Sequence, residues 1–150
     1  RSHVAALDCH PAREFPERAE HFRIRHDVFV VEQRIFADSD RDVHDDEPTT
    51  IHVIGLVDGI PAGAVRLYPL GDRLWKGDRL AVLHRYRRAG IGRPLVKCAV
   101  ALAASLGGIR MDAQIQLPNV NFFKILGWSP DGKPAEQFGV LHQHMSIPLR

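Results

Sequence analysis

The spacing of apolar side chains along the chain predicts alternating helices and strands. Apolar residues recur at helical intervals in Glu17–Gln33 and in Ile91–Leu106, and Gly107-Gly108 supplies a helix stop after the second run. Strict alternation of apolar and polar residues predicts half-buried strands at Ile109–Gln116 and Val140–Ile147. The pattern therefore predicts two amphipathic helices and at least two strands.

Turn residues divide the rest of the chain into short elements. Asp58-Gly59 is typical of a hairpin turn, and it separates apolar, β-branched Ile51–Val57 from Ala62–Leu70. The remaining predicted elements are strands at His3–Asp8 and Asp78–Leu83 and a short helix at Asn119–Leu126. This order predicts one domain over residues 1–150, of mixed α/β (α+β) class.

Composition and charge narrow the class of protein. With 150 residues and 45% apolar side chains, the chain can fold around its own core. It has no run of eighteen apolar residues and no apolar leader segment, so we expect a cytoplasmic protein that does not enter a membrane. The net charge of +2 hides two opposite segments: Asp38–Glu47 holds six acids and one base, whereas Arg73–Lys97 holds eight bases and one acid. We read the acidic segment as an exposed loop.

The basic segment contains a predicted anion site. A strand leads through arginines and glycines into a helix start at residues 79–92, where glycines let the backbone approach a phosphate and helix N–H groups point outward. The alternative is that the glycines only turn the chain and the arginines are solvated. A nucleic-acid site is disfavoured, because Tyr86 is the one aromatic residue among the central arginines.

Two motifs resemble those of the GNAT N-acetyltransferases. Arg87–Gly92 is similar to the family's Gln/Arg-x-x-Gly-x-Gly/Ala loop, and Asn121–Trp128 is similar to its helix ending in Phe-Tyr-x-x-x-Gly-Phe. Arg25–Gln33 and Gly139–Met145 further resemble the ElaA-like branch and GNATs linked to nitrogen starvation. The resemblance implies the GNAT fold, a central mixed, mostly antiparallel sheet flanked by helices. It also implies acetyl transfer from acetyl-CoA to the amine of a small molecule or to an amino-terminal group.

The resemblance carries a set of cofactor-binding residues onto this chain. In the family the loop amides bind the pyrophosphate of acetyl-CoA, and the preceding strand pairs with the pantetheine arm. The implied residues are Leu80, Ala81, Val82, Arg87, Arg88, Ala89, Gly90, Ile91, Gly92, Arg93, Asn119 and Phe123. Phe123 stands where many members have a tyrosine that protonates the leaving thiolate, so this chain must dispense with that donor. No metal is implied.

Candidate catalytic residues follow from the chemistry of acetyl transfer, which needs a proton acceptor for the amine. Glu32, with a pKa raised by burial, and His142, a neutral imidazole, are the candidates for this base. Each could instead be structural, Glu32 as a helix-end carboxylate and His142 as a packed strand residue. Arg25, Asp45, Arg66 and His144 are the candidate substrate-binding residues, and the acidic loop would attract a cationic amine.

Two other functions remain open at this stage. An acyl-CoA-binding sensor without turnover is suggested by Phe123. An acyl-homoserine-lactone synthase is suggested by Arg25–Glu32 and Arg66, although those synthases lack the Arg-x-x-Gly-x-Gly loop. The small-molecule acceptor would be the partner, with a homodimer left open.

Overall fold

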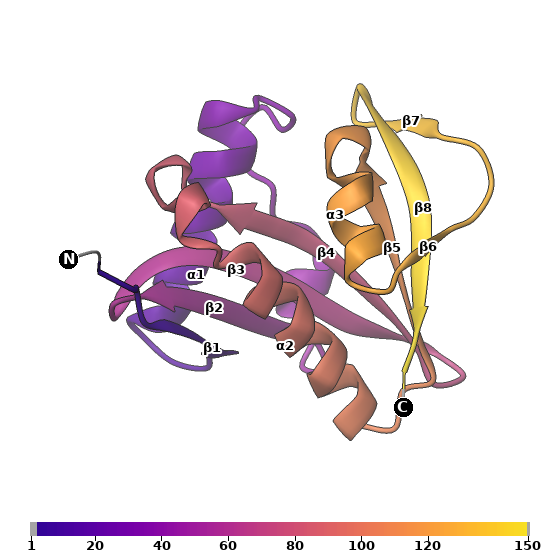
Figure 1. Ribbon diagram of the computed structural model, residues 1–150, viewed down its shortest axis with the longest axis horizontal. Coiled ribbons are helices and arrows are strands. Elements are labelled where there is room, and N and C mark those ends of the chain that lie inside the picture. The colour runs from indigo at the N-terminus through magenta and orange to yellow at the C-terminus, as the bar shows by residue number, and fades with distance from the viewer. Residues whose placement is uncertain (1–2, 150) are drawn as a thin grey trace.

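The computed structural model, which describes residues 3–149, is built on an eight-stranded sheet (Figure 1). The strand order is β1-β2-β3-β4-β5-β8-β6, and β7 pairs with β8 beside this path. The strands are β1 (Leu7–Pro11), β2 (Ile51–Val57), β3 (Ile60–Gly71), β4 (Leu74–Val82), β5 (Arg110–Gln116), β6 (Ser129–Pro130), β7 (Ala135–Gln137) and β8 (Val140–Pro148). The helices are α1 (Glu17–His26), α2 (Gly92–Ser105) and α3 (Val120–Ile125). All pairs are antiparallel except β4 with β5.

The parallel pair β4–β5 is short and sets the shape of the molecule. Only Leu74, Trp75 and Lys76 of β4 find partners on β5, and the last pair is Lys76 with Asp112. Beyond that pair the two strands separate, so the sheet opens into two halves that meet at one end (Figure 1). The unpaired edges of β4 and β5 therefore face each other across a gap that side chains must line.

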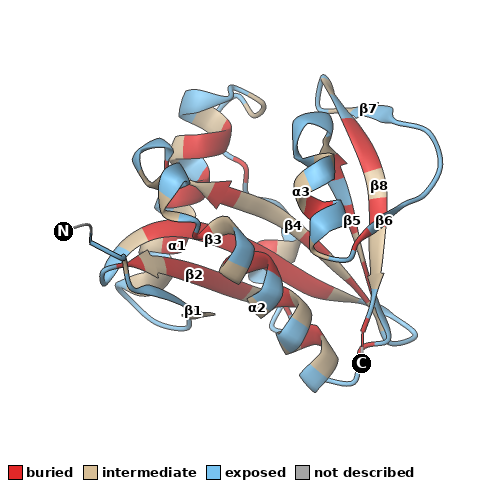
Figure 2. Ribbon diagram, in the orientation of Figure 1, coloured by how far each residue is buried: buried red, intermediate tan, exposed pale blue. Residues whose placement is uncertain are grey.

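Helices cover the two faces of the larger half of the sheet (Figure 1). The face under α2 carries the larger core, which includes Leu67, Leu95 and Met111. The face under α1 carries a smaller cluster that includes Ile24 and Ala81. Figure 2 shows the buried residues concentrated on the central strands and on the inner sides of both helices. The sequence prediction of a mixed, mostly antiparallel sheet flanked by helices is confirmed.

A bulge in β4 places two charged residues on one face. The β3–β4 register shifts between the pairs Ala64–Ala81 and Arg66–Asp78, and Arg79 has a φ of 55°. Regular alternation would turn Arg79 away from Asp78. With the bulge, both side chains lie on the α1 face and join the ion pairs described below.

The predicted hairpin, both long helices and the strands at β5 and β8 are present, and several boundaries differ. The first strand is Leu7–Pro11 and not His3–Asp8. The first helix continues as one π-helical turn at Asp27–Glu32, and β4 starts at Leu74 and not at Asp78. The short β6 and β7 were not predicted, because their positions depend on pairing with β8. No helix within residues 3–149 has the length and apolar character needed to cross a membrane.

Gly63, on β3 beneath α2, tests how tightly the helix packs on the sheet. A Cβ there would lie 2.6 Å from Leu95 Cδ1 and 3.1 Å from the Ala81 carbonyl oxygen. We expect Gly63→Ala to lower the free energy of unfolding by about 1–3 kcal/mol through overpacking. Urea unfolding of Gly63→Ala, Leu95→Ala and the double variant checks this. The loss of stability caused by Gly63→Ala should be smaller in the Leu95→Ala background, where the crowded side chain is gone. An equal cost in both backgrounds would contradict the contact.

Candidate active site

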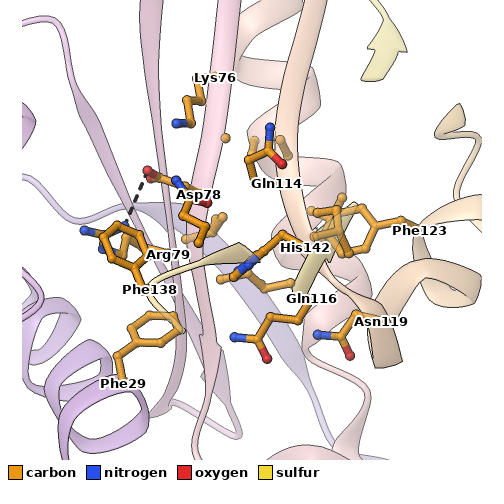
Figure 3. Close-up of a pocket in the computed structure, with 18 of the residues that line it drawn as sticks. Phe29, Lys76, Asp78, Arg79, Gln114, Gln116, Asn119, Phe123, Phe138 and His142 are labelled. Atoms are coloured by element: carbon orange, nitrogen blue, oxygen red, sulfur yellow. Dashed lines mark ion pairs between the residues drawn. The ribbon is translucent and has the colours of Figure 1, made fainter. Parts of the chain in front are cut away.

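A cavity of about 260 Å³ occupies the opening between β4 and β5. Figure 3 shows side chains from both halves of the sheet pointing into it, with Asp78 and Arg79 from β4 facing Gln114 and Gln116 from β5. His142 of β8 reaches the same space, since it pairs in register with Gln116. The cavity therefore exists because β4 and β5 stop pairing after Lys76.

His142 is held in a defined orientation at the cavity. Its side chain is 8% exposed, and Nδ1 lies 2.8 Å from the carbonyl oxygen of Val140. A carbonyl oxygen only accepts, so Nδ1 must donate and Nε2 of the neutral ring keeps its lone pair. No other described side chain hydrogen-bonds to Nε2. His142 thus has the form required of a proton acceptor.

The wall under α2 and α3 is apolar. Phe123 of α3 is 5% exposed and packs edge-on against Trp128, with ring centroids 5.3 Å apart. Both rings line the cavity, together with Leu80 of β4 and Asn119. The Phe123 ring has no hydroxyl, so it cannot donate a proton to a molecule in the cavity.

The loop after β4 has the geometry of the predicted anion cradle. A 3₁₀ helix, His84–Ala89, ends at Gly90, whose φ of 83° lies in the left-handed region that glycine tolerates, and α2 begins at Gly92. The first intrahelical bond is from the Leu95 N–H to Ile91 O, and Pro94 has no N–H. The N–H groups of Ile91, Gly92 and Arg93 consequently have no intrahelical partner.

Glu32 is an ion-pair partner of this cradle. Arg87 donates from Nη2 to Glu32 Oε1 at 2.6 Å and from Nη1 to Oε2 at 2.7 Å, and its Nε donates to Val82 O. The hydrogen bonds from Arg87 lower the pKa of Glu32, the opposite of the raised pKa that a base would need. Glu32 is also exposed and does not line the cavity. We therefore correct its assignment from base to partner of Arg87.

The acidic segment is only partly solvated, because Arg25 holds two of its carboxylates inside the protein. Arg25 is 0% exposed, and it donates to Asp40 at 2.7 Å and to both oxygens of Asp45 at 2.8 and 3.0 Å. Burial alone would raise the pKa of Asp45, but hydrogen bonds from Arg25 outweigh it and hold the pKa well below its usual range. The expectation of an exposed loop at Asp38–Glu47 is wrong for Asp40 and Asp45.

Arg66 binds the same segment to the sheet. It is 0% exposed, and it donates two bonds to Asp78 at 2.7 Å and two to Asp42 at 2.6 and 3.1 Å. Arg79 adds bonds to the carboxylate and the carbonyl oxygen of Asp40. We name the seven residues Arg25, Asp40, Asp42, Asp45, Arg66, Asp78 and Arg79 the ion network. Its carboxylates are occupied by guanidinium groups, so the expected attraction for a cationic amine is largely cancelled.

Two buried histidines lie behind the ion network. His21 Nδ1 is 2.9 Å from Val53 O, and Arg25 Nη1 lies 3.2 Å from His21 Nε2, so the ring donates on one side and accepts on the other. Burial, reinforced by the charge of Arg25, lowers the pKa of His21 to about 3. Burial, with the charge of Arg18, lowers the pKa of His52 to about 4. Both rings are neutral at physiological pH.

The structure separates the sequence-derived candidates into two groups. Those that line the cavity are Leu80, Asn119, Phe123 and His142. The four candidate substrate-binding residues do not line it: Arg25, Asp45 and Arg66 lie inside the ion network, and His144 sits 3.3 Å from Asp112. Among residues 3–149, no group of three or more His, Cys, Asp or Glu side chains is arranged to hold a metal ion.

Sequence reasoning missed most of the cavity lining outside β8 and α3. The missed residues include Phe29, Phe36, Tyr68, Lys76, Gln114, Gln116 and Phe138. Alternation along Ile109–Gln116 already put Gln114 and Gln116 on one face, but it could not show that this face borders a gap in the sheet. Only the pairing of β4 with β5, which ends at Lys76 and Asp112, shows that this face borders a gap.

Comparisons with known proteins agree with this geometry. Residues 9–128 match the model of the acetyltransferase (GNAT) family. An uncharacterized N-acetyltransferase of Bacillus subtilis, YjcF, is 33% identical over 109 residues, which are 71% of this chain and 74% of that protein. A putative N-acetyltransferase from Lactobacillus plantarum superposes with a TM-score of 0.85 at 25% identity over 97% of this chain and 99% of the other. Escherichia coli ElaA shares the fold, with a TM-score of 0.81 at 19% identity over 95% and 99%, in agreement with the ElaA-like motifs.

The buried histidines predict a loss of stability in mild acid. In the unfolded chain both take a proton near pH 6.5, whereas in the folded protein they do so only near pH 3 and 4. The unfolded state therefore binds more protons between these values, and the free energy of unfolding falls as the pH drops from 7 to 5, by about 2 kcal/mol per histidine. The network carboxylate of Asp45, with its lowered pKa, titrates below this window.

Urea unfolding at pH 7, 6 and 5 measures this dependence. The His52→Gln variant, which removes one of the two buried groups, should lose about half as much stability over the same range. Stability that stays constant or rises on acidification would contradict buried neutral rings.

Proposed function

Because the chain belongs to the acetyltransferase (GNAT) family, we propose that it transfers an acetyl group from acetyl-CoA to the amine of a small molecule. The observation that carries this proposal is the shared cavity, onto which the free edge of β4 and the imidazole of His142 both open. A donor held along β4 and an acceptor beside His142 would meet there. Family membership makes the protein an acyltransferase, which disfavours a sensor without turnover.

The cradle and the β4 edge fit the acyl donor. Acetyl-CoA, when bound, supplies a reactive thioester and a pyrophosphate. The unpaired N–H groups at the start of α2 and the positive end of the helix dipole suit the pyrophosphate. Arg88 and Arg93 are exposed beside them, whereas Arg87 is neutralised by Glu32. The backbone of Leu80–Val82 has no partner on the β5 side and is free to pair with an amide-containing arm.

His142 is the proposed general base. Nε2 accepts a proton from the acceptor's ammonium, which frees the nitrogen lone pair to bond to the thioester carbon. The carbon–sulfur bond then breaks, and the departing thiolate takes the second proton that the nitrogen loses as the amide forms. Phe123 offers no proton to the leaving sulfur, and none is required, because a thiol of pKa about 8.5 is a tolerable leaving group. The apolar wall of Phe123 and Trp128 keeps water from competing with the amine.

The base assignment is tested with three variants. We expect His142→Ala to lower kcat/KM about 100-fold or more, the usual worth of a general base, and to abolish the acidic limb of the pH–rate profile. His144→Gln, on the same strand and face but outside the cavity, should stay within about threefold, as should Glu32→Gln at saturating acetyl-CoA. A profile unchanged by His142→Ala would remove His142 from the mechanism.

The donor site is tested at Gly92. A Cβ there would meet only Phe122 Cζ at 3.7 Å and Val82 Cγ2 at 3.9 Å, so a side chain is tolerated and the fold should survive. Gly92→Glu places a carboxylate at the start of α2, and we expect the Kd for acetyl-CoA to rise at least tenfold in calorimetry. Ala101→Glu adds the same charge on the exposed side of α2 and serves as the control. Equal affinities in the two folded variants would refute the cradle.

A further inference from the structure

Three polar side chains from neighbouring strands line the cavity near the end where β4 and β5 pair. Tyr68 of β3 pairs in register with Lys76 of β4, and Lys76 pairs with Asp112 of β5. Gln114 lies two residues beyond Asp112 and so projects from the same face. All three line the cavity, and Figure 3 shows Lys76 and Gln114 at one end of it.

These side chains have hydrogen-bonding capacity that the folded chain leaves unused. Among the described residues, none of Tyr68, Lys76 and Gln114 has a side-chain hydrogen bond or an ion pair. Tyr68 is 4% exposed, and its ring stacks on His44 with centroids 4.0 Å apart. Its unpaired hydroxyl oxygen keeps some exposure, so a ligand in the cavity can reach it. Burial raises the pKa of Tyr68 to about 12, so the hydroxyl stays a donor at neutral pH. An ammonium, a hydroxyl and an amide N–H together suit an anion.

Two of the three carboxylates near Lys76 are fully engaged by Arg66. Asp78 and Asp42 each accept two hydrogen bonds from Arg66. Asp112 lies 3.2 Å from an Arg110 nitrogen and 3.3 Å from His144 Nε2, although its buried Oδ1 accepts no hydrogen bond from the described residues. Lys76 is therefore the charged side chain of the cavity that keeps no partner among residues 3–149.

Building on the proposed acetyl transfer, we propose that the acceptor is an amino acid, whose carboxylate binds Lys76 with help from Tyr68 and Gln114. The spacing suits such a molecule. Lys76 pairs with Asp112 and His142 with Gln116, so their backbones lie four residues, or about 13 Å, apart along β5, with Gln114 midway, and the long lysine side chain can shorten this span. A carboxylate at Lys76 thus directs the amine of a compact amino acid toward His142.

The opposite wall indicates an apolar side chain on that amino acid. Phe36 comes from the segment after α1 and Phe138 from the turn before β8, and their rings meet across the opening with centroids 4.7 Å apart. Phe29 lines the cavity on the same side. These rings offer no charge or hydrogen-bonding group to a substituent, so an aliphatic or aromatic side chain fits best there.

The experiment compares amino acids with the amines that remain when their carboxylate is removed, for example phenylalanine with 2-phenylethylamine. With acetyl-CoA as donor, we expect kcat/KM at least tenfold higher for the amino acid. Lys76→Met should erase this ratio by raising KM for the amino acid while activity toward the amine stays within about threefold. Lys76→Arg should keep part of the ratio, and Lys133→Met, an exposed lysine outside the cavity, should keep all of it.

The possible failures point to different conclusions. Acetylation of both compounds with a ratio that Lys76→Met does not change would overturn the carboxylate site and leave acetyl transfer standing. An unchanged ratio with lower stability toward urea would identify Lys76 as a counter-ion of Asp78, which also overturns the site. Acetyl-CoA that binds without acetylation of any amino acid or amine in the panel would overturn both proposals.

Discussion

The short pairing between β4 and β5 is the constraint on which the site depends. Three residue pairs join the two halves of the sheet, and the strands then separate. One separation creates three features together: a free backbone edge on β4, a cavity, and access from β8 to that cavity. A longer parallel pairing would bury these groups in a ladder and leave no place for two substrates to meet.

The ion network holds one side of this opening in place. Arg25 and Arg66 are wholly buried, and removing either would leave carboxylates without partners, at a cost of about 3–5 kcal/mol for a broken buried pair. An apolar core could supply similar stability. The ion network also fixes the position of the chain, because it holds Asp42 and the segment that follows Phe36 against β3 and β4. The bulge at Arg79 allows β4 to contribute two charged side chains to this network.

Local patterns predicted the parts of this protein that local forces determine. Helical spacing located α2, alternation located β5 and β8, and the Arg87–Gly92 motif located the turn into α2, because each follows from backbone geometry over a few residues. The ion network could not be found this way. Six acids in Asp38–Glu47 are typical of a solvent-exposed loop. The sequence does not show that the guanidinium groups of Arg25 and Arg66, which are distant along the chain, lie against this loop and pair with its carboxylates. The grouping of Tyr68, Lys76 and Gln114 likewise depends on how β3, β4 and β5 pair, which local patterns do not determine.

The turn that follows α1 connects the cavity wall to the loop before α2. Asp27–Glu32 forms a π-helical turn, with the Gln33 N–H donating to Val28 O five residues back, and such turns recur at functional sites. Within four residues it places Phe29 against the cavity and Glu32 on Arg87 of the cradle. A pyrophosphate arriving at the cradle would compete with Glu32 for Arg87, because both are anions within reach of one guanidinium group. One short turn thus contacts both the cavity wall and the loop before α2.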